Sequence, residues 1–230
     1  MAQDGLNPTA GSSAQGWQGV VSDWSDDKQA FQVPWGKAMM WIFLLSDTFI
    51  FTSFLTGYMN VRMSTAVPWP NPSEVFALTI FGQSIPLILI AIMTFVLITS
   101  SGTMAMAVNF GYRGNRHRAA ALMLITAAFG AIFVGMQAFE WTKLIVEEGV
   151  RPWANPMGAS QFGGAFFMIT GFHGLHVSAG VIYLTVVALK VLRGDYEGGG
   201  GNYEIVEIVG LYWHFVDLVW VFIFALFYLW

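Results

Sequence analysis

Apolar positions along the chain gather into long stretches that are nearly free of charge, separated by short polar segments. A helix needs about 20 mainly apolar residues to cross the hydrocarbon core of a bilayer. Five stretches are long enough, and open strands cannot satisfy their backbone groups in lipid. The pattern therefore predicts an all-α integral membrane bundle of five transmembrane helices, at about residues 38–61, 84–110, 119–142, 161–191 and 206–230.

The second apolar stretch, residues 75–112, contains 38 uncharged residues. This is more than one span needs and fewer than two spans with a turn would need. Proline is well tolerated in the first turn of a helix. We therefore interpret Pro86 as an early helical residue, with residues 75–83 at the membrane interface, and predict one span. Long unbroken apolar runs exclude a transmembrane barrel.

The N-terminal segment differs in composition from the rest of the chain. Residues 1–34 are rich in Gly, Ser, Gln and Asp and lack the apolar core of a signal peptide. We predict a polar arm there and a five-helix domain over residues 35–230. The absence of cysteine excludes disulfides and thiolate metal sites on this chain.

Composition and charge support a membrane protein and suggest its orientation. Hydrophobic residues make up 56% of the chain and charged residues 10%, against about a quarter charged in ordinary soluble domains. Lys and Arg accumulate on the cytoplasmic side of membrane proteins. With five spans, one side carries seven of them, and the other carries Arg62, Lys143 and Arg151. We expect a cytoplasmic N-terminus and a periplasmic C-terminus. The seven are Lys28, Lys37, Arg113, Arg116, Arg118, Lys190 and Arg193.

A basic turn between the second and third spans contains three of these arginines. Arg113, Arg116 and Arg118 could hold anionic lipid headgroups on the cytoplasmic surface. The alternative is that they serve only as the orientation signal.

Away from the extreme ends of the predicted spans, six ionisable side chains lie at bilayer depth, where each costs about 2.5 to 3.5 kcal/mol on insertion scales. Such groups should face protein and suggest a function. A rise of about 1.5 Å per residue puts five of them in one layer of the inner half of the membrane, whereas Glu140 lies near the outer surface. The five are Asp47, His173, His176, His214 and Asp217.

Histidines and carboxylates at this spacing raise the possibility of a metal site. His173 and His176 share one helical face, and His214 with Asp217 repeat the spacing, so four ligands could converge. A carboxylate di-metal bundle, however, needs two Glu-x-x-His motifs, and Glu140 is followed by Trp-Thr-Lys. We favour a buried hydrogen-bonded network linking the first, fourth and fifth spans, with no metal. Metal ligation stays as the alternative.

Small residues form candidate helix-packing seams, because they let helix backbones approach closely in lipid. We expect the third and fourth spans to pack there, although any glycine-rich span would show a similar pattern. The seam residues are Ala127, Ala131, Gly135 and Ala138 on the third span, and Gly171, Gly174 and Ser178 on the fourth.

Four segments together resemble one protein family, subunit III of the heme-copper terminal oxidases. The resemblance covers about residues 35–230 and rests on the order and spacing of the segments as well as on their residues. They are "LLSDTFIF" at 44–51, "QAFEW" at 137–141, "TGFHGLHV" at 170–177 and "YWHFVDLVW" at 212–220.

The resemblance implies a non-catalytic core subunit of a proton-pumping complex that reduces dioxygen to water in an aerobic respiratory chain. It implies a multi-pass protein of the bacterial inner membrane, bound directly to oxidase subunit I, with subunit II and small subunits as further partners. Heme and copper would be on those partners and phospholipid on this chain, with no nucleic acid involved. Cytochrome c or quinol, as electron donor, would dock elsewhere.

Family positions also give the polar residues an implied role in supporting proton uptake. Asp47 matches a buried, carbodiimide-reactive carboxylate that is usually Glu in the family, and here it is one methylene shorter. The remaining matches are Glu140, His173, His176, His214 and Asp217.

Other functions stay open at this point. Five spans, where long relatives have seven, resemble short bacterial forms and quinol oxidases, and a protein associated with nitric oxide reductases shares the pattern. A stand-alone transporter would suit intramembrane Asp and His, but no inverted repeat or pair of broken helices is present. A membrane-bound metal oxygenase would need ligand sets that the sequence lacks.

Overall fold

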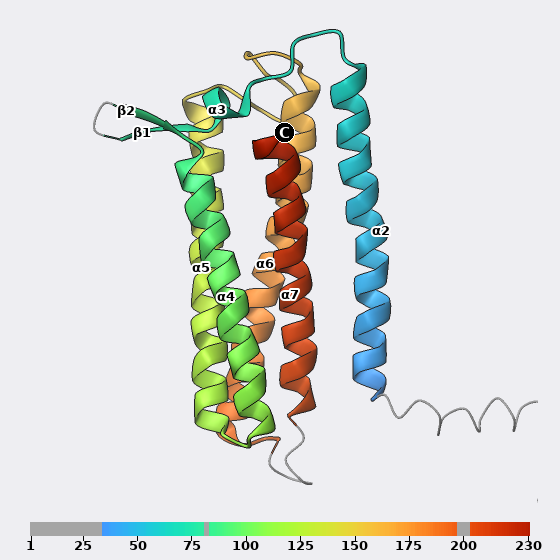
Figure 1. Ribbon diagram of the computed structural model, residues 1–230, viewed down its shortest axis with the longest axis vertical. Coiled ribbons are helices and arrows are strands. Elements are labelled where there is room, and N and C mark those ends of the chain that lie inside the picture. The colour runs from blue at the N-terminus through green and yellow to red at the C-terminus, as the bar shows by residue number, and fades with distance from the viewer. Residues whose placement is uncertain (1–33, 81–82, 197–202) are drawn as a thin grey trace, which may run out of the picture. The chain divides into compact units, whose positions relative to one another are not determined.

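A computed structural model describes residues 34–80, 83–196 and 203–230 (Figure 1). The chain divides into two compact units, Met1–Ala38 and Met39–Trp230, and all contacts discussed below lie within the second. The predicted polar arm lies outside the described residues except for Pro34, as does Lys28, so the arm stays a prediction.

Five long helices span the described part of the chain. They are long and apolar enough to cross a membrane, so the predicted all-α class with five spans is confirmed, and the chain is a multi-pass membrane protein. With 25 residues, α4 is about 37 Å long, which exceeds a hydrocarbon core of about 30 Å. The helices are α2 (Trp35–Ser64), α4 (Ile88–Tyr112), α5 (Arg116–Val146), α6 (Gln161–Arg193) and α7 (Glu204–Phe224), which continues into a π-helical turn, η1 (Ala225–Leu229).

The segment before α4 differs from its prediction. A short helix, α3 (Pro72–Val75), is followed by an antiparallel hairpin of β1 (Ala77–Ile80) and β2 (Gln83–Pro86). The interpretation of Pro86 as an early helical residue is therefore wrong, because Pro86 ends β2. The helix starts only after Leu87, whose left-handed φ of 58° turns the chain from strand to helix.

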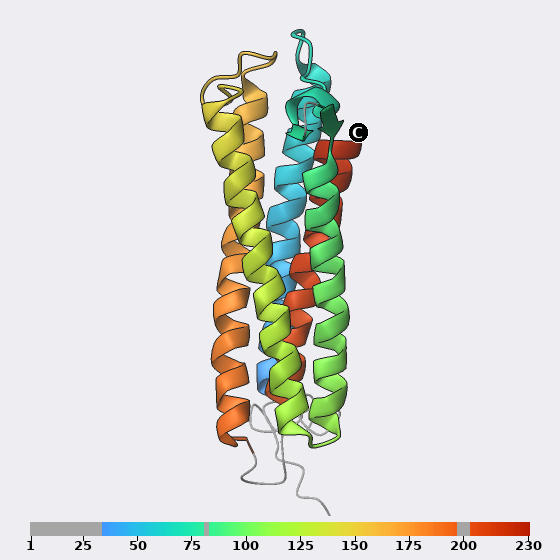
Figure 2. The ribbon, with the colours of Figure 1, turned by 90° about the vertical axis from the view of Figure 1, so that its left-hand side faces the viewer.

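Four of the helices pack in a closed order, α4 against α5, α5 against α6, α6 against α7 and α7 against α4 (Figures 1 and 2). We call α4–α7 the four-helix group. The buried core runs through its centre, and α6 and α7 contribute most to it, with thirteen and eleven buried residues. By contrast, α2 has four buried residues along its 30 residues.

Trp213 on α7 connects all four helices of this group. Its indole Nε1 donates a hydrogen bond to Ser100 Oγ on α4 at 2.9 Å. Its ring occupies the space that a side chain would need at Gly130 on α5 and at Gly180 on α6. The two glycines therefore leave room for a large aromatic ring between the helices. Lipid is as apolar as the side chains, so helices in a bilayer associate mainly through such close packing.

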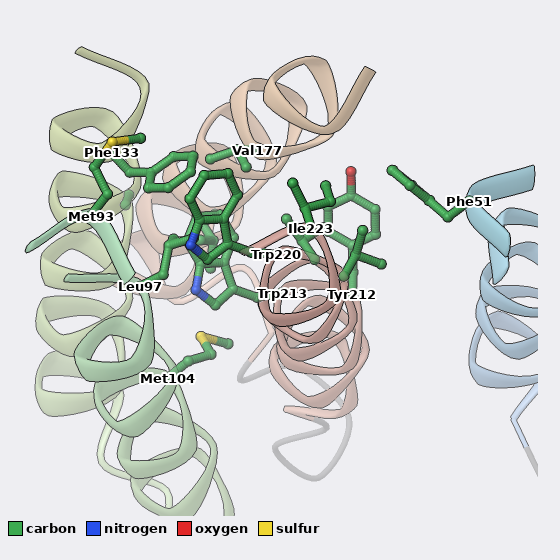
Figure 3. Packing of buried hydrophobic residues seen from close by; sticks show 14 of the residues in the cluster. Phe51, Met93, Leu97, Met104, Phe133, Val177, Tyr212, Trp213, Trp220 and Ile223 are labelled. Atoms are coloured by element: carbon green, nitrogen blue, oxygen red, sulfur yellow. The ribbon is translucent and has the colours of Figure 1, made fainter. Parts of the chain in front are cut away.

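Trp220, two helical turns along α7, repeats this arrangement (Figure 3). Its Nε1 donates to Thr94 Oγ1 on α4 at 3.0 Å. Its ring packs edge-on against Phe133 on α5, at 4.7 Å between centroids, and stacks on His173 on α6 at 5.3 Å. Two tryptophans thus fix the register of the four helices.

The predicted small-residue seams are only partly correct. Gly171 does lie against a neighbouring helix, since a side chain there would come within 3.0 Å of the Trp141 ring on α5. Ala131 and Gly135 are exposed, and a side chain at Gly135 or Gly174 would meet no other residue within 4 Å. The predicted seam of α5 is wrong because the face of α5 that packs against the other helices contains Gly130 and not Ala131. Neighbouring residues of a helix point about 100° apart around its axis, so a shift of one residue moves the seam to another face.

Candidate functional site: polar groups between the helices

A hydrogen-bonded pair joins α2 to α6. Asp47 Oδ2 lies 2.9 Å from His176 Nε2, and the two side chains are 7% and 11% exposed. On the other side of the ring, His176 Nδ1 lies 2.8 Å from the carbonyl oxygen of Phe172, one turn earlier in α6. Both ring nitrogens of His176 are therefore engaged.

The two contacts together determine how many protons the pair carries. A carbonyl oxygen can only accept, so Nδ1 of His176 must be protonated and donate to Phe172. An ionised carboxylate is also only an acceptor, so the contact with Nε2 requires a further proton, either on Asp47 or on the ring. The pair thus holds one proton between the two groups, and its net charge is zero in either form.

Aromatic contacts surround this pair. Phe51 on α2 places its ring 5.5 Å from that of His176 and 5.2 Å from that of Phe172. On α7, the Tyr212 hydroxyl donates to the backbone carbonyl oxygen of His176 at 3.0 Å. The pair is thereby enclosed by side chains of α2, α6 and α7.

His173 does not join this pair, although the sequence pattern groups it with His176. It is fully buried, and within the described residues neither ring nitrogen has a hydrogen-bond partner. Its ring packs between Trp220 and the edges of Phe133 and Phe51. His173 therefore acts as an aromatic core residue of the four-helix group, and the predicted network does not extend through it.

His214 makes a separate contact on α7. Its Nδ1 lies 2.6 Å from the Ser101 hydroxyl on α4, which joins these two helices. Asp217 lies three residues farther along α7 and is 8% exposed. The predicted inner layer thus divides into a pair between α2 and α6, an aromatic histidine in the core, and a pair between α4 and α7.

Glu140 lies apart from these groups, near the end of α5. It is 3% exposed, and the Tyr228 hydroxyl in η1 donates to its two carboxylate oxygens over 3.4 and 3.5 Å. A cavity of about 10 Å³, enough for about one water molecule, is lined by Glu140 and Lys143. The Lys143 ammonium in turn donates to the carbonyl oxygen of Ala77, at the start of the hairpin.

The three arginines gather at the short turn between α4 and α5. The guanidinium of Arg113 lies 5.9 Å from the centroid of the Phe110 ring, and that of Arg118 lies 5.4 Å from it. Arg116 is the first residue of α5. The structure brings the three together at one end of the helices, and headgroup binding there stays a prediction.

Among the residues that the structure describes, no three His, Asp, Glu or Cys side chains gather closely enough to hold a metal ion. His176 is engaged by Asp47, His173 packs against aromatic rings, and His214 contacts Ser101. The three histidines that could converge by spacing thus make three different contacts, and Asp217 takes part in none of them.

Sequence reasoning overlooked several residues that hold the site. Trp213 and Trp220 carry the packing of the four-helix group, and Ser101 and Tyr212 provide partners for His214 and His176. A signal was present in the segment "YWHFVDLVW", since two tryptophans seven residues apart in the middle of a span cannot both sit at the membrane surface. No comparable indication was present for Gln137. Its buried amide has no hydrogen-bond partner in the described part of the chain.

The fold and the buried groups together define a polytopic membrane protein that joins its helices through isolated polar pairs and aromatic packing. The sequence profile of one family, described as cytochrome c oxidase subunit III, matches residues 14–230. The chain belongs to this family.

Individual relatives carry related names. A cytochrome c oxidase subunit 3 of Alkalihalophilus pseudofirmus is 32% identical over 190 residues, which cover 82% of this chain and 84% of the relative. A probable quinol oxidase subunit 3 of Staphylococcus epidermidis is 30% identical, with coverages of 88% and 92%. A cytochrome bo(3) ubiquinol oxidase subunit 3 of Pseudomonas aeruginosa is 31% identical, with coverages of 82% and 82%.

Proposed function

We propose that this chain is a non-catalytic core subunit of a bacterial heme-copper terminal oxidase that reduces dioxygen and pumps protons. The observation that carries the proposal is the family match over residues 14–230, nearly the full chain. The chain binds directly to subunit I, with subunit II and small subunits in the same complex. Heme and copper are held by the partners, and the electron donor docks on them.

The electron donor is cytochrome c or a quinol. Relatives of similar identity carry both kinds of name, at 32% for a cytochrome c oxidase and 31% for a ubiquinol oxidase. No residue of this chain needs to contact the donor in either case, so both versions share the same role for the subunit. The seven-to-three distribution of Lys and Arg supports a cytoplasmic N-terminus and a periplasmic C-terminus.

Within the complex, the pair of Asp47 and His176 supports proton uptake by keeping α2 in place beside α6. The pair stays neutral as a unit, so it can be buried without a third charge. Replacing Asp47 by Ala should leave the initial rate of oxygen reduction largely intact but shorten the time over which the enzyme keeps turning over. Complete loss of the initial rate in a fully assembled complex would contradict a supporting role.

Purification through an affinity tag on this chain tests the proposal as a whole. The expected result is a complex that contains heme-bearing subunits and shows their visible spectrum, while the separated chain carries neither heme nor copper. The electron donor is then identified by offering reduced cytochrome c and a quinol to the same preparation. If the chain purifies alone and moves protons or solutes in vesicles, it is a transporter and the proposal is wrong.

A further inference from the structure

A small cavity lies at the end of the four-helix group beside α3 and the hairpin (Figure 1). Its volume is about 10 Å³, and its walls come from the end of α3, the first turn of α4 and the last two turns of α5. Five apolar side chains line it together with Glu140 and Lys143. The cavity thus combines an apolar wall with one acidic and one basic group.

The carboxyl group of Glu140 has fewer hydrogen-bond partners than it can accept. It is 3% exposed, and its partner among the described residues is the Tyr228 hydroxyl, over 3.4 and 3.5 Å. A tyrosine hydroxyl carries one proton, whereas the two oxygens of an ionised carboxylate can accept about four. Burying a carboxylate without hydrogen bonds is costly, so a further donor should reach Glu140.

Lys143 provides a donor on the same side of α5. The two residues are three positions apart, and such residues are neighbours on a helix surface. The Lys143 ammonium donates to the carbonyl oxygen of Ala77, and two of its three protons remain for other acceptors. In the described part of the chain, Glu140 and Lys143 form no direct ion pair, so the cavity separates the two groups.

The size and chemistry of the cavity select water as its occupant. About 10 to 15 Å³ holds one water molecule, provided that two to four polar partners surround it. Cavities that stay empty are lined by apolar groups, whereas Glu140 and Lys143 offer acceptors and donors here. An organic ligand is too large for this volume, Lys143 repels a second cation, and Glu140 repels an anion.

We propose that this cavity binds one ordered water molecule, which accepts a hydrogen bond from the Lys143 ammonium and donates one to the Glu140 carboxyl group. The water completes a hydrogen-bonded chain from the Ala77 carbonyl through Lys143 and Glu140 to the Tyr228 hydroxyl. The chain joins β1, α5 and η1. It goes beyond the oxidase role proposed above and does not depend on it.

Such a chain has a defined task at this end of the molecule. A two-stranded hairpin is marginally stable alone, so β1 and β2 need an attachment to the helices. Lys143 attaches the start of β1 to α5, and the hairpin leads through Leu87, with its left-handed φ, into α4. The water therefore couples the entry into α4 with the position of η1.

A cryo-electron microscopy map of the intact complex tests the site without any variant, at a resolution that shows ordered waters. The expected result is a peak within hydrogen-bond distance of both Lys143 Nζ and the Glu140 carboxyl group. An empty cavity in a map that shows ordered waters elsewhere in this chain would overturn the proposal. A direct contact between the two side chains would overturn it as well.

Hydrogen exchange of the purified complex tests the coupling. Lys143→Met should speed exchange of the amides in β1 and η1 by roughly tenfold, as expected for the loss of one charge-assisted hydrogen bond. Lys190→Met is the matched control, because Lys190 is exposed in the last turn of α6, at the other end of the helices, and it should change neither segment. Faster exchange in β1 alone would mean that Lys143 acts on Ala77 without the water, which contradicts the chain.

Discussion

The four-helix group and α2 are held by different means. Within α4–α7, close contacts between backbone glycines and the tryptophans of α7 bring the helices together, as at Gly130, Gly180 and Trp213. Helix α2 reaches its neighbours through long aromatic side chains, through the polar pair of Asp47 with His176, and through Arg62, which donates to the Trp230 backbone oxygen. It leaves a groove beside it. Close packing makes the group a single rigid element, whereas α2 depends on a few separate contacts.

The largest effect is expected from Trp213→Ala. The ring is fully buried and its loss removes both the hydrogen bond to Ser100 and the packing over two glycines, which should cost about 3 to 5 kcal/mol. Trp41→Ala on α2, where the ring is 55% exposed, is the control and should cost less than about 1 kcal/mol. Thermal unfolding of the purified complex measures both, and equal costs would contradict the difference between the regions.

Next in size is Gly130→Ala. The added methyl group would overlap the Trp213 ring and Val181, which should destabilise the four-helix group by about 1 to 3 kcal/mol. Gly135→Ala, five residues along the same helix, meets no other residue within 4 Å and should change stability by less than about 0.5 kcal/mol. A Gly135 variant as unstable as the Gly130 variant, in the same unfolding assay, would show that the inward face of α5 is assigned incorrectly.

Breaking the polar pair should have a smaller effect, confined to α2. Asp47→Leu removes the partner of His176 Nε2 and should weaken the attachment of α2 by about 1 kcal/mol. In Asp47→Asn, an amide N–H can donate to Nε2 while Nδ1 still donates to Phe172, so most of the attachment should return. Limited proteolysis of the loop between α2 and α3 reports the attachment, and equal sensitivity of both variants would argue against the pair.

The smallest effect is expected for Phe54→Leu. This ring makes an edge contact with Phe172 at 5.4 Å between centroids, and replacing it by an aliphatic side chain of similar size should cost about 0.5 kcal/mol. The same proteolysis assay should show a slight increase in cleavage beside α2. A cost as large as that of Asp47→Leu would mean that the aromatic contacts carry the attachment and the polar pair does not.

The hydrophobic pattern predicted the class and the number of the helices, because the bilayer sets the minimum length of each span. It did not predict the hairpin before α4, since Pro86 suits a first helical turn as well as the end of a strand. The pattern also did not predict that Gly130 faces the other helices and Gly135 faces away from them. A membrane helix carries apolar residues on both its protein-facing and its lipid-facing side, so hydrophobicity does not distinguish the two.

The polar residues show the same limit. Their presence within the spans could be predicted from the cost of burying charge, which restricts them to protein-facing positions. Which of these residues contact one another could not be predicted. His173 and His176 are only three residues apart, yet His173 packs against aromatic rings and His176 contacts Asp47. That choice depends on the neighbouring helices, and the spacing along one helix contains no information about them.

Hydrogen exchange of the purified complex, followed by mass spectrometry, tests most directly whether α2 is attached separately from a rigid four-helix group. The account predicts that amides of α2 exchange faster than those of α4–α7, and that Asp47→Leu accelerates α2 further without changing α5 or α7. If α2 exchanges as slowly as α5, or if Asp47→Leu loosens all five helices equally, the chain unfolds as one unit and the account is wrong.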